Sequence, residues 1–483
     1  MSLAFESATA LAQMINDKEI SARELTDYYM DRIERFDGPL NAVPVRDFER
    51  ARKAADLADQ AQTAGRSIGP LHGLPMTIKE SYNIAGLPTT FGQPLLKDNV
   101  ASEDAEVVKR LKAAGAHFLG KTNVPINLGD WQSYNEIYDT TNNPWDTSRT
   151  PGGSSGGSAA ALAAGLCALE SGSDIAGSIR NPAHYCGVYG HKPTYGVVPQ
   201  LGHARPGSFA PIDLVVVGPM ARSAKDLAIA LDVVAGADPL SAPGWKLDLA
   251  RPQMKTLADY RMAIWPNDPL APVSGEMADR VQTLGDQLSS LGATVSDTAR
   301  PDFDPEVSWQ ANWYLLRSLT GSVLPDDQFK EMQKAAETFG PDDISVRALR
   351  TRGSVLLHKD RLRWKNTREI LRMAWREFFN DWDILLCPQM ATTAFEHDHS
   401  LITERQITVD GERQDYFQQI FWAGLATVSY LPSTVFPTGS GADGLPIGLQ
   451  AVSAEFNDYT CINFAHLMEQ EFGGFVAPPD YAE

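Results

Sequence analysis

Two short blocks rich in glycine and serine constrain this chain more than any other feature. Residues 151–158 read Pro-Gly-Gly-Ser-Ser-Gly-Gly-Ser, and residues 173–180 read Ser-Asp-Ile-Ala-Gly-Ser-Ile-Arg. Glycine allows the main chain to approach a ligand closely, and serine becomes a nucleophile when a base removes its proton. The composition of the first block alone would favour a flexible linker. The second block and a lysine segment upstream of both favour an active site for acyl transfer instead.

Three further segments match the pattern to which these blocks belong. They read Gly-Pro-Leu-His-Gly-Leu-Pro-Met-Thr-Ile-Lys-Glu at 69–80, Gly-Val-Tyr-Gly-His-Lys-Pro-Thr at 187–194 and Gly-Leu-Pro-Ile-Gly-Leu-Gln at 444–450. Together with the two blocks, they resemble the amidase signature family of serine hydrolases over nearly the whole chain. One position departs from the family pattern, because Ala176 stands where that pattern has glycine. Alanine still supplies its N–H, so we expect this departure to change the shape of the pocket more than the mechanism.

The resemblance implies roles for three side chains. Ser178 is the expected nucleophile, Ser154 the expected bridging serine on an unusual cis peptide bond, and Lys79 the expected base. A lysine acts as a base only when it is neutral, and burial beside Met76 and Ile78 would lower the pKa of Lys79. We expect Lys79 to take a proton from Ser154 while Ser154 takes one from Ser178. The proton then returns along the same route to the leaving amine.

Main-chain N–H groups beside the nucleophile are expected to hold the developing oxyanion. They belong to Ile175, Ala176, Gly177 and Ser178. One donor of this kind is typically worth about 3 to 4 kcal/mol in transition-state stabilisation. Water would then hydrolyse the acyl-enzyme.

Supporting roles fall to residues close to the two blocks. Ser155 is expected to support the proton relay by a hydrogen bond, whereas Asp174 and Arg180 are expected to brace the loop around the nucleophile. Ser158 is predicted to cap the helix that the following alanines indicate. His72, in the loop before the lysine, is the one histidine that we expect at the border of the site.

A pocket wall is predicted from the segment upstream of the first block. By resemblance, Leu128, Gly129 and Trp131 border the scissile group of the substrate. The wall would then be partly aromatic and apolar. This favours an aryl or alkyl amide over a strongly charged one.

Three motifs that indicate other chemistry are rejected on their context. Residues 115–122 fit the phosphate-loop pattern, but a helical run precedes them and a strand-like run lies inside them, the reverse of what that loop requires. Residues 152–156 fit the nucleophile elbow of α/β-hydrolases, yet a polar loop bounded by prolines stands where a buried strand is needed. Residues 396–399 read Glu-His-Asp-His without a partner at zinc spacing. No metal and no cofactor are therefore expected.

Charge and composition limit the classes of partner that this protein is expected to bind. The formal net charge of −19 argues against broad contact with nucleic acid, because such contact depends on basic side chains. No apolar run reaches the roughly 20 residues that span a bilayer, and the N-terminus lacks the plan of a signal peptide. The four cysteines form no C-x-x-C pair, so we expect them to be reduced and buried. The sequence predicts a cytoplasmic enzyme, a monomer or homodimer, that binds a small-molecule amide and neither nucleic acid nor membrane.

Hydrophobic periodicity alternates between helix and strand along the chain. Helices are predicted over 8–15, 22–36 and 48–61, the second opened by a capping box of Ser21 and Glu24. A helix followed by a strand is predicted twice, and two further runs are predicted as buried strands; these segments are 107–119, 281–295, 261–265 and 384–387. This alternation and the family resemblance predict a three-layer α/β/α fold around a large sheet that is mixed or largely parallel.

The functional segments are scattered from Lys79 to Gln450, which favours a single domain over 1–483. Within it we distinguish four parts: an N-terminal helical segment (1–65), a signature core (66–238), a variable, mostly helical substrate-side region (239–380) and the C-terminal part of the core (381–483). The third part begins with a proline-rich loop and is rich in aromatic residues.

Two functions fit these observations. The first is a stand-alone amidase that cleaves the carbon–nitrogen bond of a small hydrophobic amide; the same acylation would also serve an ester. The second is a glutaminase-type component of a tRNA-dependent amidotransferase, which would pass ammonia to partner subunits. We favour the first. An inactive binding protein is disfavoured because all three catalytic positions are filled.

Overall fold

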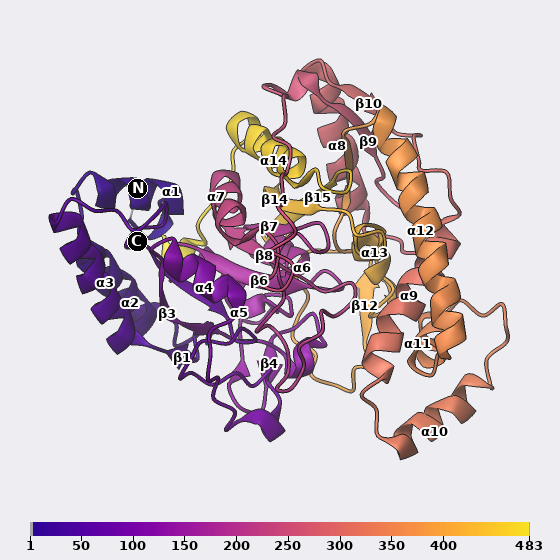
Figure 1. Cartoon of the computed structure of the whole chain (residues 1–483). Helices are drawn as coiled ribbons and strands as arrows, with labels where there is room; N and C mark the ends of the chain where they lie inside the picture. The colour runs from indigo at the N-terminus through magenta and orange to yellow at the C-terminus, as the bar shows by residue number, and fades with distance from the viewer. Residues whose placement is uncertain (1–2, 483) are drawn as a thin grey trace.

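One large mixed sheet forms the centre of the protein, whose computed structural model describes residues 3–482 (Figure 1). Strand β9 pairs in parallel with β10 and β11, and the other neighbouring pairs are antiparallel. The prediction of a mixed sheet is confirmed, and the alternative of a largely parallel sheet is wrong. The strands lie in the spatial order β10 (Thr294–Ser296), β9 (Arg261–Ile264), β11 (Ile384–Pro388), β15 (Pro446–Val452), β14 (Ser433–Ser440), β7 (Tyr189–Lys192), β8 (Val216–Ala221) and β6 (Glu170–Asp174).

A smaller sheet continues the large one beyond β6. It contains β1 (Val45–Arg46), β3 (His117–Thr122) and β2 (Pro75–Lys79) in that order. The Thr77 N–H donates to the Leu169 carbonyl, 3.3 Å away, which ties β2 to the chain just before β6. The strand β1 was not predicted. Its partner Gly120 must be glycine, because a Cβ atom there would lie 2.1 Å from the Val45 carbonyl oxygen.

Helices cover both faces of the large sheet, which confirms the three-layer prediction. On strand β15, Gly448 and Gln450 face helix α6 (Arg180–Cys186), since Gly448 packs on His184 and Gln450 binds Arg180. On the neighbouring strand β14, Phe436 points to the opposite face and packs on Phe464 of α14 (Asp458–Phe472). Helices α5 (Gly156–Ala163) and α13 (Ile420–Val428) lie with α6, whereas α7 (Ala224–Val234) and α8 (Gly275–Ser290) lie with α14.

The N-terminal helices lie at one end of the sheet and close to the C-terminus (Figure 1). They are α1 (Ala8–Asn16), α2 (Ala22–Phe36) and α3 (Phe48–Thr63), followed later in the chain by α4 (Glu106–Ala113). The capping box that opens α2 is confirmed, because the side chains of Ser21 and Glu24 each bind the backbone N–H of the other. Phe5 stacks on Phe475, which holds the two ends of the chain side by side.

The substrate-side region predicted over 239–380 lies at the other end of the molecule (Figure 1). Residues 239–252 form neither helix nor strand, as their prolines predict. Trp309 and Trp313 are buried, with 2% of each side chain exposed, so both belong to the core. Besides α8, which covers the large sheet, the helices of this region are α9 (Pro305–Gly321), α10 (Asp326–Ala336), α11 (Val346–Ser354) and α12 (His358–Asp381). Two hairpins, β4 (Tyr134–Asn135) with β5 (Asp139–Thr140) and β12 (Gln406–Val409) with β13 (Glu412–Asp415), complete the fold.

Candidate active site

Lys79 is the last residue of β2 and is fully buried. Its Nζ atom lies within hydrogen-bonding distance of three serine hydroxyls, at 2.7 Å from Ser154, 2.9 Å from Ser155 and 3.0 Å from Ser173. Burial lowers the pKa of Lys79 to about 7, against the opposing negative charges of Asp174 and Glu170. A lysine with this pKa is neutral in a large share of molecules at neutral pH, which is the state that a base requires.

Ser154 lies in the tight turn that leads into α5. The peptide bond between Gly153 and Ser154 is cis. The Gly153 N–H donates to the Asn181 side-chain oxygen at 2.9 Å, so the turn is fixed to the first residues of α6. A Cβ atom at Gly153 would lie 2.5 Å from the Asp130 carbonyl oxygen, and only glycine fits there. The glycines of the first block therefore serve close backbone packing around Ser154.

Ser178 lies in the turn between β6 and α6, with 4% of its surface exposed. The Ser155 N–H donates to the Ser178 carbonyl at 3.1 Å, which joins the two serine-rich turns directly. Within residues 3–482 the Ser178 hydroxyl makes no hydrogen bond. The structure thus connects Lys79 to Ser154, and it brings Ser178 beside them without a hydroxyl-to-hydroxyl bond.

Asp174 and Arg180 brace the turn that carries Ser178. Two guanidinium N–H groups of Arg180 donate to the Asp174 carboxylate, each at 3.0 Å, and both side chains are fully buried. Burial would raise the pKa of Asp174, but the charge and hydrogen bonds of Arg180 hold it at about 2. The carboxylate also accepts the N–H groups of Gly177 at 2.8 Å and Ile179 at 3.1 Å. Because Asp174 holds the Gly177 N–H, this group is not free to bind an oxyanion, and the expected donors reduce to Ile175, Ala176 and Ser178.

Trp131, which lies outside the turn between β6 and α6, supports that turn by a hydrogen bond. Its indole N–H donates to the Ala176 carbonyl at 2.9 Å, and 2% of the residue is exposed. Trp131 also packs against Phe417, with ring centroids 5.3 Å apart. Leu128 is half-buried, with a φ of 57°, and Gly129 is exposed. The structure therefore ties Trp131 to the turn that carries Ser178 and leaves Leu128 and Gly129 accessible to solvent.

A buried ion pair fixes the segment that contains Trp131. The Asp130 carboxylate pairs with Arg405 at 2.5 Å and accepts the Tyr416 hydroxyl at 2.7 Å. Neither Arg405 nor Tyr416 was singled out from the sequence, since more than 270 positions separate each from Asp130. No local pattern could have indicated these contacts.

Two minor predictions need correction. Ser158 lies inside α5 and bonds to the Thr122 hydroxyl at 2.8 Å, so it is no helix cap. His72 precedes β2, whereas Lys79 ends it, and the His72 ring accepts the Ile68 N–H at 3.1 Å. His72 therefore lies at the wrong end of the strand. The sequence-based prediction also missed Ser173, although its position in the second serine-rich block was a usable signal.

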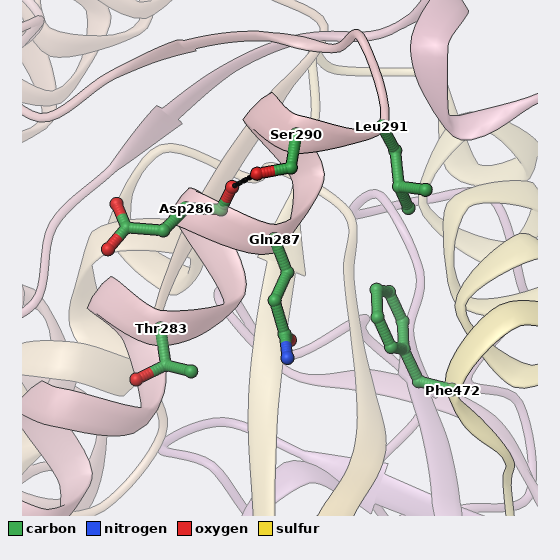
Figure 2. A pocket seen from close by; sticks show the side chains of 6 residues that line it. All are labelled: Thr283, Asp286, Gln287, Ser290, Leu291 and Phe472. Carbon is green, nitrogen blue, oxygen red and sulfur yellow. Dashed lines mark hydrogen bonds between the residues drawn. The ribbon is translucent and has the colours of Figure 1, made fainter.

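The hollow at α8 and the cysteines do not form a second functional site among the described residues. The hollow in Figure 2 is lined by one face of α8 and by Phe472, and it holds none of the residues predicted for the site. Across residues 3–482, no three His, Cys, Asp or Glu side chains lie together as a metal site would need. No helix in the same span is both long and apolar enough to cross a membrane. All four cysteines are buried and free.

Comparison with known proteins places the chain in a family. The amidase family pattern matches residues 24–462. This protein is a member of the amidase signature family. An acylamidase of Rhodococcus erythropolis is 34% identical over 94% of this chain and 92% of its own length. One component of the glutamyl-tRNA(Gln) amidotransferase of Moorella thermoacetica is 33% identical over 97% of both chains.

Solved structures agree with this membership. A bacterial aryl acylamidase of the amidase signature family superimposes with a TM-score of 0.80 and 26% identity over 96% of both chains. A 6-aminohexanoate cyclic dimer hydrolase superimposes with the same TM-score and 25% identity over the full length of both. The amidase signature enzyme described here hydrolyses carbon–nitrogen bonds of amides. Its relatives include both hydrolases and amidotransferase components, so its substrate is a separate question.

Proposed function

We propose that this chain is a stand-alone amidase that acts on small, largely apolar amides through an acyl-enzyme on Ser178. The observation that carries the acyl-enzyme mechanism is the 2.7 Å contact between the Lys79 Nζ and Ser154 Oγ atoms in a fully buried setting. The 34% identity to an acylamidase supports the stand-alone function. A buried lysine that contacts only hydroxyls and a carbonyl, with a pKa of about 7, is suited to accept a proton through Ser154.

The proposed mechanism runs in two halves. Neutral Lys79 takes the Ser154 proton while Ser154 takes the Ser178 proton, and the Ser178 oxygen attacks the amide carbon. The N–H groups of Ile175, Ala176 and Ser178 hold the oxyanion, and the proton returns by the same route to the leaving amine. Water then attacks the acyl ester, and its proton passes to Lys79 through Ser154. The proton returns to the Ser178 oxygen as the acid is released. The Ser154–Ser178 hydrogen bond must form when substrate binds, as catalytic bonds that are open in a free enzyme commonly do.

The apolar substrate preference rests on the surroundings of the turn. The Trp131 indole binds the Ala176 carbonyl, Phe417 packs against Trp131, and Leu128 lies in the segment that leads to Trp131. An aryl or alkyl group on the amide would bury apolar surface against them. Esters would react too, because the acylation step is the same.

A glutaminase-type amidotransferase component is the second candidate. It is favoured by one observation, the 33% identity to a component of a glutamyl-tRNA(Gln) amidotransferase over 97% of both chains. The serine and lysine groups cannot separate the two functions, because both need the same acylation.

The test is turnover by the purified chain alone. A panel of anilides, alkyl amides and primary amides, with glutamine among them, is assayed without any partner protein or ATP. Turnover of anilides or alkyl amides well above that of glutamine supports the stand-alone function. Glutamine turnover that appears only with partner subunits and ATP would replace it with the second candidate.

A further inference from the structure

Arg350, on helix α11, is a cation without a polar partner. It is half-buried, yet within residues 3–482 its guanidinium makes no hydrogen bond and no ion pair. Each other buried or half-buried arginine in that range binds a carboxylate, a carbonyl oxygen or a hydroxyl. Although the chain has 61 acidic residues, none of those that the structure describes pairs with this guanidinium.

A second guanidinium lies behind Arg350. Arg317, on helix α9, is also half-buried, and among residues 3–482 its guanidinium bonds only to the Ser354 hydroxyl, at 3.1 and 3.2 Å. Burial and the positive charge of Arg350 lower the pKa of Arg317 to about 10. Helices α9 and α11 touch backbone to backbone, because a Cβ atom at Gly321 would lie 2.0 Å from the Ser354 carbonyl oxygen. Two like charges are thus held near each other by rigid packing.

Two charged side chains act on the Arg350 guanidinium, one of each sign. Arg317 repels it, and Asp415 of β13 attracts it without forming an ion pair with it. The Asp415 carboxylate already accepts the Phe417 N–H at 2.9 Å. Burial lowers the pKa of Arg350, and Asp415 only opposes this. The guanidinium fork of Arg350 therefore stays available to an external anion.

Arg350 is separated from the catalytic turn by two aromatic rings. Its Cζ atom lies 4.5 Å from the centroid of the Phe417 ring, which packs against Trp131 at 5.3 Å. The Trp131 indole N–H binds the Ala176 carbonyl in the turn around Ser178. Figure 1 shows α9 and α11 beside the β12 hairpin, on the side of the molecule that we assign to the substrate. The aromatic rings of Trp131 and Phe417 thus lie between the turn that carries Ser178 and the guanidinium of Arg350.

We propose that Arg350, supported by Arg317, binds a carboxylate carried by the substrate amide at a distance from the scissile bond. A guanidinium presents paired N–H donors that match a carboxylate, and this recognition strengthens where water is partly excluded. The rings of Phe417 and Trp131 predict an apolar spacer between the amide and the carboxylate. The inference rests on the proposed amidase function and narrows its substrate to an amide with an apolar body and an anionic end.

The first experiment compares matched substrates. Anilides whose acyl chain ends in a carboxylate are compared with anilides of the same length that end in a methyl group, over a series of spacer lengths. A second arm places the carboxylate on the aniline ring, which shows whether the anion lies on the acyl or the amine side. The expected result is a higher kcat/KM for the carboxylate member at one spacer length in one arm. Equal or lower values at all lengths in both arms would overturn the inference.

Variants then assign the preference to the arginine pair. In Arg350→Gln, the ratio of kcat/KM for the carboxylate over the methyl substrate is expected to fall by roughly 10- to 100-fold, the range of a hydrogen bond to a charged group. Arg350→Lys is expected to retain part of the ratio, and Arg317→Gln to reduce it less. Arg347→Gln is the control, because Arg347 lies on the same helix but is exposed and packs on Phe339. An unchanged ratio in folded Arg350→Gln would contradict the proposal.

Binding separates this inference from the proposed function. The Ser178→Ala chain is titrated with the preferred carboxylate anilide and its methyl partner by calorimetry. Tighter binding of the carboxylate that is lost in Ser178→Ala/Arg350→Gln supports the anion site even if no anilide is hydrolysed by the parent. Hydrolysis of methyl-ended anilides without a carboxylate preference in binding would uphold the amidase function and overturn the anion site.

Discussion

The Lys79 Nζ atom lies 2.7 Å from the Ser154 Oγ atom, inside a shell of hydroxyls that contains no carboxylate at ion-pair distance among residues 3–482. A lysine beside a carboxylate would stay charged, whereas burial lowers the pKa of this lysine to about 7. The contact therefore marks Lys79 as a proton acceptor rather than a member of a salt bridge.

Ser154→Ala tests the bridge between base and nucleophile. The substitution removes the hydroxyl that contacts Lys79 and leaves the cis turn, Ser155 and Ser178 in place. We expect kcat to fall by several powers of ten, each about 1.4 kcal/mol in barrier height, with residual turnover where water replaces the hydroxyl. Steady-state kinetics on one anilide gives the result. Ser158→Ala, in the same helix start but bonded to Thr122, is the control. Near-parent kcat in Ser154→Ala would rule out the relay.

The pH profile reports the charge on Lys79. Only neutral Lys79 can accept a proton, so kcat/KM is expected to rise with pH through a pKa near 7 and then level. Burial raises the pKa of Glu170 to about 7, and where Glu170 is ionised its negative charge raises the pKa of Lys79. Glu170→Gln is therefore expected to move the rise to lower pH. Glu80→Gln is the control, because Glu80 is buried nearby but binds Thr90 and Phe91 instead. A profile that is flat from weakly acidic to alkaline pH would exclude a lysine base.

The shifted pKa of Lys79 makes the free energy of unfolding depend on pH. Its pKa falls from 10.5 in the unfolded chain to about 7 in the folded one. Between these values the unfolded chain binds the extra proton, so Lys79 costs stability as pH falls from 10.5 to 7, by about 1.4 kcal/mol per pH unit. Lys79→Met lacks this titration, so its free energy of unfolding is expected to rise relative to that of the parent as pH falls from about 10 to 7. Denaturant titration at both values measures this, and a difference independent of pH would show an unshifted lysine.

Trp131→Phe isolates the support of the oxyanion turn. Phenylalanine keeps the packing on Phe417 but loses the N–H that binds the Ala176 carbonyl. Because one neutral hydrogen bond is worth about 1 kcal/mol, we expect kcat to fall by roughly fivefold to tenfold with little change in KM. A change confined to KM would show that Trp131 acts only through contact with the substrate and that its indole N–H does not support the turn. Trp145→Phe, whose indole N–H binds Cys186 elsewhere, controls for loss of an indole.

Local signals in the sequence were enough to predict some parts of this protein. Helix α2 could be predicted because Ser21 and Glu24 cap its first turn, and Lys79, Ser154 and Ser178 could be located because each lies in its own short motif. Alternating periods predicted a sheet between layers of helices, but they left mixed and largely parallel pairing open and did not give the strand order, since pairing depends on contacts between distant segments.

The rest of the site depends on long-range contacts that no local pattern encodes. Arg405 reaches Asp130 across 275 positions, and Arg350 is notable only because the fold leaves it without a partner among the described residues. The Gly177 N–H looked available from its place in the motif, yet the fold turns it onto Asp174. Which N–H groups face a substrate is decided by the geometry of one turn, and the residue types alone cannot fix it.

The role of Ser178 as a nucleophile served by Lys79 and Ser154 can be tested by intact-mass spectrometry after exposure to a fluorophosphonate probe. The parent chain and its Ser178→Ala variant are treated side by side. We predict one adduct on the parent, no adduct on Ser178→Ala, and slower labelling in Lys79→Met. An adduct on Ser178→Ala equal to that on the parent would place the nucleophile elsewhere and refute the proposed relay.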